Sequence, residues 1–153
     1  MSASLEWAWE GSRLLLSGRI DENADLEALV GEIPASGATL DLAGLSRINS
    51  IGVREWMDFV STVADRPLTL ERCAPVFVDQ LNAIANFAGG ATVKSVLATY
   101  ECEADGESQL LEAQTADVRD GRLPFSPRCP RCAAEMVPAQ ENELYYRFLR
   151  YGK

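Results

Sequence analysis

The strongest constraint on the fold is an alternation of strand-like and helix-like hydrophobic patterns over roughly the first 97 residues. The spacing of apolar residues predicts the element order β-β-α-β-α-β-α-β, with breaks at glycines and prolines. Strands separated by helices form a mostly parallel or mixed sheet, because each helix supplies the crossover that a parallel strand requires. We therefore expect an α/β fold, in which helices cover the sheet.

The clearest helix is expected just after residue 50. Its apolar residues recur at helical spacing, and Pro67 ends the region. The preceding strand, at residues 38–44, has an apolar run that suits a strand covered on both faces. A hairpin is expected at the start of the chain, and residues 91–97 are expected to form the last strand of this region. The apolar residues that predict the helix are Val53, Trp56, Met57, Val60 and Val63.

Composition excludes several classes of function. The 153 residues contain no histidine, which removes imidazole bases, imidazole metal ligands and the usual Ser/His and Cys/His nucleophile pairs. No pair of acidic residues is spaced to act as acid and base, so we expect a protein that is not an enzyme. The net charge of −9 argues against nucleic acid and anionic lipid as main partners.

The expected compartment is the cytoplasm. The first ten residues lack the cationic start and long apolar stretch of a signal peptide. Nothing approaches the run of about 20 apolar residues that a membrane span needs. Four cysteines without an export signal do not resemble a secreted disulfide framework, so we expect a reducing environment.

One turn carries a specific motif. A strand of the form Leu-Asp-Leu is followed by a short loop and by Asn49-Ser50-Ile51-Gly52 at the start of the next helix. This segment resembles the STAS domain of bacterial anti-anti-sigma factors and of the C-termini of sulfate transporters, whose motif here is Asp-Ser-Ser-Gly. Asn49 stands for the Asp, Ser50 and Ile51 for the two serines, and Gly52 matches. Residues 17–21 are similar to the family's first strand-to-helix turn.

The resemblance implies a non-catalytic protein–protein interaction module in bacterial signalling. In anti-anti-sigma factors a partner kinase phosphorylates the residue that aligns with Ser50, so the implied partner is an anti-sigma or serine kinase-type regulator. A helix N-terminus tolerates a phosphate, whereas an apolar or acidic partner surface does not. The alternative is that Ser50 merely caps the helix. The implied partner surface comprises Asn49, Ile51, Gly52, Arg54, Glu55 and Asp58, with Phe59 exposed near its edge.

Two other functions stay open. A nucleotide or small-molecule sensor is one, although Gly89-Gly90 is a weak phosphate-loop signal. A structural subunit of a larger assembly is the other.

The residues after about 97 predict a small β-rich appendage. Cys129 and Cys132 have the spacing of a zinc knuckle, and Cys102 with Asp105 forms a second pair in which aspartate replaces cysteine. The pattern resembles a zinc ribbon with one ligand changed. Alternatives are a ribbon without metal and a redox pair of Cys129 and Cys132. The expected divisions are 1–97 for the STAS-like domain, 98–138 for the appendage and 139–153 for an amphipathic tail that packs on the sheet or ribbon or binds a partner.

Overall fold

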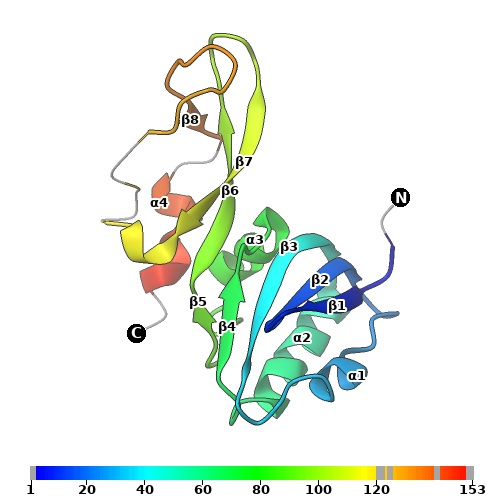
Figure 1. Ribbon diagram of the computed structural model, residues 1–153. Helices are drawn as coiled ribbons and strands as arrows, with labels where there is room; N and C mark the ends of the chain where they lie inside the picture. Colours follow the sequence, from blue (N-terminus) through cyan, green and yellow to red (C-terminus); the bar gives the residue numbers. More distant parts are fainter. Residues whose placement is uncertain (1–2, 120–122, 124–125, 140–141, 151–153) are drawn as a thin grey trace.

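The computed structural model describes residues 3–119, 123, 126–139 and 142–150, which form two sheets, a layer of helices and a C-terminal tail (Figure 1). The elements before residue 94 are β1 Glu6–Glu10, β2 Arg13–Ile20, α1 Leu26–Val30, β3 Ala38–Ile48, α2 Ser50–Thr62, β4 Leu68–Glu71, α3 Pro75–Ala83 and β5 Thr92–Val93. The later elements are β6 Ser95–Glu101, β7 Ser108–Gln114, the 3-10 turn Thr115–Asp117, β8 Val137–Pro138, α4 Asn142–Tyr145 and the 3-10 turn Arg147–Arg150.

The first sheet has five strands in the order β1-β2-β3-β4-β5. The opening hairpin pairs β1 with β2 antiparallel, and every later neighbour is parallel. The sheet is therefore mixed, and the α/β class expected from the alternation is confirmed.

All three helices of this region lie on one face of the sheet. Trp56 of α2 stacks edge-on against Phe77 of α3 at 5.1 Å between ring centroids, and α1 packs beside α2. Leu40 and Leu42 of β3 point toward these helices and are fully buried. Thr39, on the alternate face, is half-buried. On this alternate face Asp41 is 3% exposed, so the expected cover on both faces is found around Asp41 and is less complete at Thr39.

A cluster of aromatic rings forms the centre of the helical layer. Trp56, Phe77 and Phe87 pack mutually, and the Trp56 Nε1–H donates to the carbonyl of Phe87 at 3.0 Å. This bond satisfies the indole nitrogen, which water does not reach. The loop after α3 is thereby fixed onto α2.

The strand expected at residues 91–97 is in fact two strands. β5 ends at Val93, the Lys94 N–H bonds to the carbonyl of Leu70, and the chain then turns into β6. β6 first runs beside the end of β4 through a parallel bridge between Cys73 and Val96. It then leaves to become the centre of a second, three-stranded sheet in the order β7-β6-β8. One strand thus spans the expected boundary at residue 97 and joins both sheets (Figure 1).

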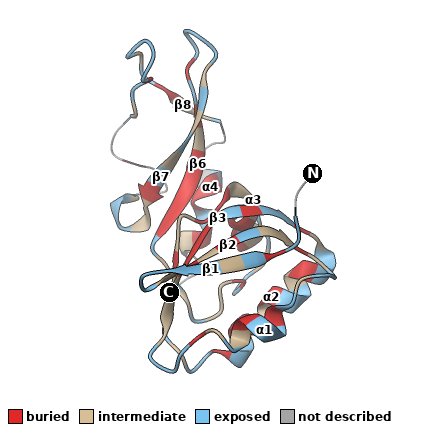
Figure 2. Cartoon of the chain, turned by 45° about the vertical axis from the view of Figure 1, so that its right-hand side comes forward, coloured by how far each residue is buried: buried red, intermediate tan, exposed pale blue. Residues whose placement is uncertain are grey.

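The tail packs back onto the helical layer. The Asn82 amide of α3 donates to the carbonyl of Tyr145 at 2.9 Å and accepts from the Phe148 N–H at 2.8 Å. The Tyr145 hydroxyl donates to the carbonyl of Leu97 in β6. Figure 2 shows buried segments concentrated in β6, in the helices and in α4. None of the helices in the described part of the chain has the length and apolar character needed to cross a bilayer.

Candidate functional site

The first candidate site is the start of α2. Asn49 has extended backbone with φ of −96°, and its Oδ1 accepts from the Gly52 N–H at 2.8 Å. Asn49 is therefore the N-cap, and Ser50 is the first residue within the helix. The interpretation of Ser50 as the cap was wrong, because the neighbouring amide takes that position. Ser50 is exposed.

Asn49 also connects this turn to the loop after β2. Its Nδ2 donates to the Glu22 carboxylate at 2.9 Å. Hydrogen bonds from the backbone N–H of Glu22 and from Asn49 lower the pKa of the Glu22 carboxyl below 4.5. These hydrogen bonds favour the carboxylate form of Glu22.

Gly52 has a packing role. A Cβ at this position would lie 1.8 Å from the Ile20 carbonyl oxygen, so only glycine lets α2 approach the end of β2 so closely. Gly52 is buried and is not available to a partner, contrary to its expected place on the partner surface.

The other expected surface residues are accessible in different degrees. Arg54, Glu55 and Asp58 are exposed, and the side chain of Ile51 is 48% exposed. Ser50, Arg54 and Asp58 follow one another at four-residue spacing, which places them along one stripe of α2. Phe59 was expected near the edge of this surface and is instead buried in the aromatic cluster beside Trp56.

The second candidate site is at the far end of the three-stranded sheet. One ligand atom from each of Cys102, Asp105, Cys129 and Cys132 lies within 4.8 Å of the others. The Cys102 and Cys132 sulfur atoms are 3.4 Å apart, and the Cys129 thiol contacts Asp105 Oδ2 at 3.4 Å. The structure therefore brings together all four predicted ligands, in a cluster that has the donors for a metal ion.

The two ligand pairs lie on loops of the same backbone design. Gly106 N–H bonds to the Cys102 carbonyl at 2.8 Å, and Ala133 N–H bonds to the Cys129 carbonyl at 2.8 Å. Both donors have positive φ, 79° and 65°. Each first cysteine also bonds through its N–H to the carbonyl five residues later, at 2.8 and 2.9 Å. Asp105 consequently occupies in its loop the position that Cys132 occupies in the other.

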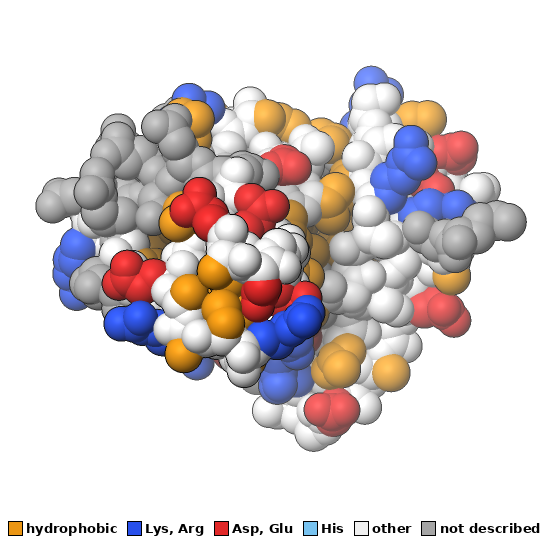
Figure 3. All heavy atoms as spheres, turned by 90° about the horizontal axis from the view of Figure 1, so that it is seen from above, with side chains coloured by type: hydrophobic (Ala, Val, Ile, Leu, Met, Phe, Trp, Pro, Cys, Tyr) orange, Lys and Arg blue, Asp and Glu red, His pale blue; other side chains and the backbone are white. Residues whose placement is uncertain are grey.

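Hydrogen bonds and neighbouring groups in the cluster favour an ionised Asp105 and an un-ionised Cys132. The Glu107 N–H bonds to Asp105 and lowers the pKa of that carboxyl. The Ala134 N–H favours the Cys132 thiolate, but the neighbouring Cys102 and Cys129 thiols and burial outweigh it and raise the pKa of Cys132 to about 11. In the view from this end, side chains of both charges surround a small apolar tip (Figure 3).

A partly buried charge network that sequence reasoning missed lies where the two sheets meet. Asp41 is 3% exposed and accepts from Arg13 at 2.5 Å and from Arg72 at 3.2 Å. Arg13 also pairs with Glu71 at 3.2 Å, and these side chains line an open cleft of 590 Å³. The charges satisfy one another, so the network holds strands together. Arg13, Asp41 and Glu71 come from three separate strands and Arg72 directly follows β4, so no local sequence pattern signals the network.

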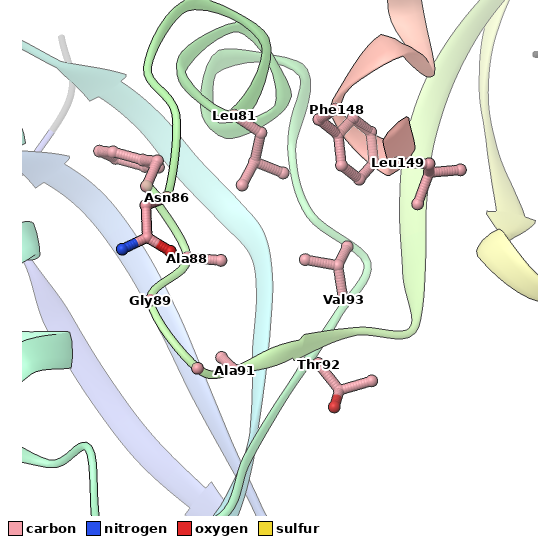
Figure 4. Close-up of a pocket in the computed structure, with 11 residues that line it drawn as sticks. Leu81, Asn86, Ala88, Gly89, Ala91, Thr92, Val93, Phe148 and Leu149 are labelled. Carbon is pink, nitrogen blue, oxygen red and sulfur yellow. The ribbon is translucent and has the colours of Figure 1, made fainter. Parts of the chain in front are cut away.

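A pocket of 430 Å³ adjoins Gly89 and Gly90, the residues that suggested a nucleotide loop (Figure 4). The side chains that point into it include those of Leu81, Val93 and Phe148. None of its described lining residues is Lys or Arg. A phosphate group would find no cationic side chain among them.

Comparison of the sequence with models of known protein families and with curated proteins finds no match. Function must therefore be argued from the two sites themselves.

Proposed function

We propose that this protein is a non-catalytic interaction module of bacterial signalling, similar to an anti-anti-sigma factor, whose binding surface surrounds Ser50. The observation that carries the proposal is the exposed Ser50 at the first position of α2, while Asn49 performs the capping. A serine freed from capping at an exposed helix start is accessible to a kinase. We place the protein in the cytoplasm, where reduced thiols such as those of the cysteine cluster persist.

The surroundings of Ser50 suit a reversible switch. Phosphate at this position would lie at the positive end of the α2 dipole, and Arg54 follows one helical turn later on the same stripe. The fold would therefore accept the modification. Ile51, 48% exposed, would anchor the unmodified surface to a partner, and about two added negative charges beside it would be costly to desolvate.

Capture from a lysate of the native organism tests this proposal. The full chain serves as bait, with bound proteins quantified by mass spectrometry and phosphosites mapped on the native protein. We expect wild type and Ser50→Ala to enrich a regulator of the serine kinase class. Ser50→Asp should reduce its capture about tenfold or more, because a charge then enters the interface.

Ser61→Asp is the matched control, since Ser61 is exposed near the other end of α2. It should leave capture unchanged. Equal capture of the regulator by wild type and Ser50→Asp would contradict a switch at this residue and would favour a structural subunit.

A second proposal concerns the cluster of Cys102, Asp105, Cys129 and Cys132, which we assign to structural zinc. Sulfur ligands with one carboxylate oxygen are a donor set that zinc accepts, and two matched loops are the arrangement of closed structural sites. The two loops have the same backbone hydrogen bonds, so Asp105 is placed as a ligand in the same way as Cys132. A redox pair of Cys129 and Cys132 would not explain this match, which favours the zinc assignment. Bound zinc would cross-link the β6–β7 turn to the segment before β8.

Elemental analysis of the purified full chain tests the zinc proposal. We expect one zinc ion per chain, lost in Cys129→Ser and retained in the control Cys73→Ala, whose thiol lies in the core away from the cluster. Asp105→Cys should bind zinc more tightly in competition with a chromophoric chelator, because it completes a four-sulfur site. Metal-free wild-type protein, or retention of zinc by Cys129→Ser, would contradict the assignment.

A further inference from the structure

The described residues of the two sheets leave four strands with a neighbour on one side only: β1, β5, β7 and β8. The free edge of such a strand presents unpaired N–H and C=O groups to any other extended chain. Proteins protect these edges by making them short, by charge or by proline. The four edges of this protein differ sharply in that protection.

Three of the edges are protected. β5 and β8 contain two residues each, and β8 ends with Pro138, which has no N–H to donate. β1 carries Glu6 and Glu10 at its two ends. If two β1 strands paired antiparallel about their centre, Glu6 of each would face Glu10 of the other, and like charges directly opposite are destabilising.

β7 is the least protected of the four edges. It is seven residues long, contains neither proline nor lysine, and carries one charged residue, Glu112. Leu110 at its middle is 54% exposed, the largest exposed fraction among the large hydrophobic side chains of the described chain. β7 forms the outer side of the three-stranded sheet (Figure 1).

We propose that a second copy of this chain pairs with β7 edge to edge, antiparallel, to form a two-fold symmetric dimer. The two three-stranded sheets would join into one continuous sheet through β7 of each copy. Backbone hydrogen bonds would supply the pairing, as in other cases of strand addition. A two-fold axis makes the same strand complementary to itself.

The side chains of β7 select one register for this pairing. With the axis at Leu110, that side chain packs against Leu110 of the partner subunit, and both exposed leucines are buried. Glu112 then lies opposite Ser108 of the partner subunit, whose hydroxyl can donate to the carboxylate. An axis at Glu112 would oppose two like charges, and an axis at Leu111 would place Leu110 against Glu112 of the partner subunit.

The side chains of β7 are complementary to those of a second, antiparallel β7, and for this reason we assign a second copy of the chain as the partner of this edge. Ser108 and Glu112 lie at equal distances along the strand on either side of Leu110, and both are exposed on the same face as Leu110. The only charge of β7 therefore meets a neutral hydrogen-bond donor, so the net charge of −9 on each chain is not concentrated at the contact.

Sedimentation equilibrium of the full chain over a range of concentrations tests the dimer. We expect wild type to dimerise and Leu110→Lys to remain monomeric at the same concentrations, because the variant places two cations at the axis. Leu144→Lys is the matched control: Leu144 is 53% exposed but lies in α4, so this variant should dimerise as wild type does. Unchanged circular dichroism checks that each variant is folded.

Ser108→Lys tests the register. It places a cation opposite Glu112 of the partner subunit at two symmetric positions, so dimerisation should tighten about tenfold. A monomeric wild type throughout, or dimerisation of Leu110→Lys as strong as that of wild type, would overturn the proposal. Weaker or unchanged dimerisation of a folded Ser108→Lys would overturn the register.

Discussion

At the scale of single residues, Asn49 caps α2, so the hydroxyl of Ser50 is not needed as the cap. The Asn49 oxygen caps α2 through the Gly52 N–H, and its amide nitrogen holds the Glu22 carboxylate. Ser50 next to it is left exposed. The structural integrity of this turn therefore depends on Asn49, whereas a change at Ser50 alters the surface and leaves the cap in place.

Replacing Asn49 should reveal both of its contacts. Asn49→Ala should lower the free energy of unfolding by about 1 kcal/mol, since the Gly52 N–H loses its cap. Asn49→Ser retains a capping oxygen and should keep most of that stability, while losing the contact to Glu22. Urea denaturation measures the first effect. Equal losses in the two variants would contradict the assignment of Asn49 as the cap.

The same contact has a signature in pH dependence. The pKa of Glu22 is lowered in the folded protein, so the contact stabilises the fold above the ordinary value of 4.5 and its contribution is lost as pH falls through the lowered pKa. In both Asn49 variants the pKa of Glu22 should rise toward 4.5. Carboxyl chemical shifts in an NMR titration measure it, and an unchanged Glu22 pKa would show that the Asn49 contact is absent in solution.

At the scale of elements, the approach of α2 to β2 depends on one missing side chain. Gly52→Ala forces a methyl group against the Ile20 carbonyl, and we expect it to cost about 1–3 kcal/mol of unfolding free energy. Gly90→Ala is the matched control, because a Cβ at Gly90 meets nothing within 4 Å. That variant should be neutral or slightly stabilising in urea denaturation. A tolerated Gly52→Ala would mean that α2 sits farther from β2.

The elements that sequence predicts well are those with local causes. α2 follows from its apolar spacing, and the two loops that carry the cysteine cluster follow from the spacing of Cys102, Asp105, Cys129 and Cys132 and from Gly106, because both depend on residues a few positions apart. The burial of Phe59 was missed because α2 packs against the sheet, against α1 and, through Trp56, against Phe77 of α3, which widens its apolar face beyond one stripe. The break at Lys94 depends on hydrogen bonds to Leu70 and Thr115, distant in sequence.

At the scale of the whole molecule, long-range polar contacts decide how the parts join. Arg13 lies in β2, Asp41 in β3 and Arg72 directly after β4, and their ion pairs lie where the sheets meet. No periodicity within one segment could have predicted them. The tail is held in a similar way, because Asn82 of α3 both donates to and accepts from its main chain.

We therefore expect the two hydrogen bonds of Asn82 to hold the tail against α3. In Asn82→Ala, the Tyr145 carbonyl and the Phe148 N–H lose their partner, so we expect residues 145–149 to detach at a cost of about 1–3 kcal/mol. Amide hydrogen exchange should show lost protection there, while amides of β2 and β3 stay protected, since the core of the first sheet does not depend on these two hydrogen bonds. Gln80→Ala, on the same helix, should leave the tail protected. If the tail of Asn82→Ala were protected as well as that of wild type, the tail would instead be anchored by Tyr145 and Phe148. These two residues are buried, with exposed fractions of 4% and 6%.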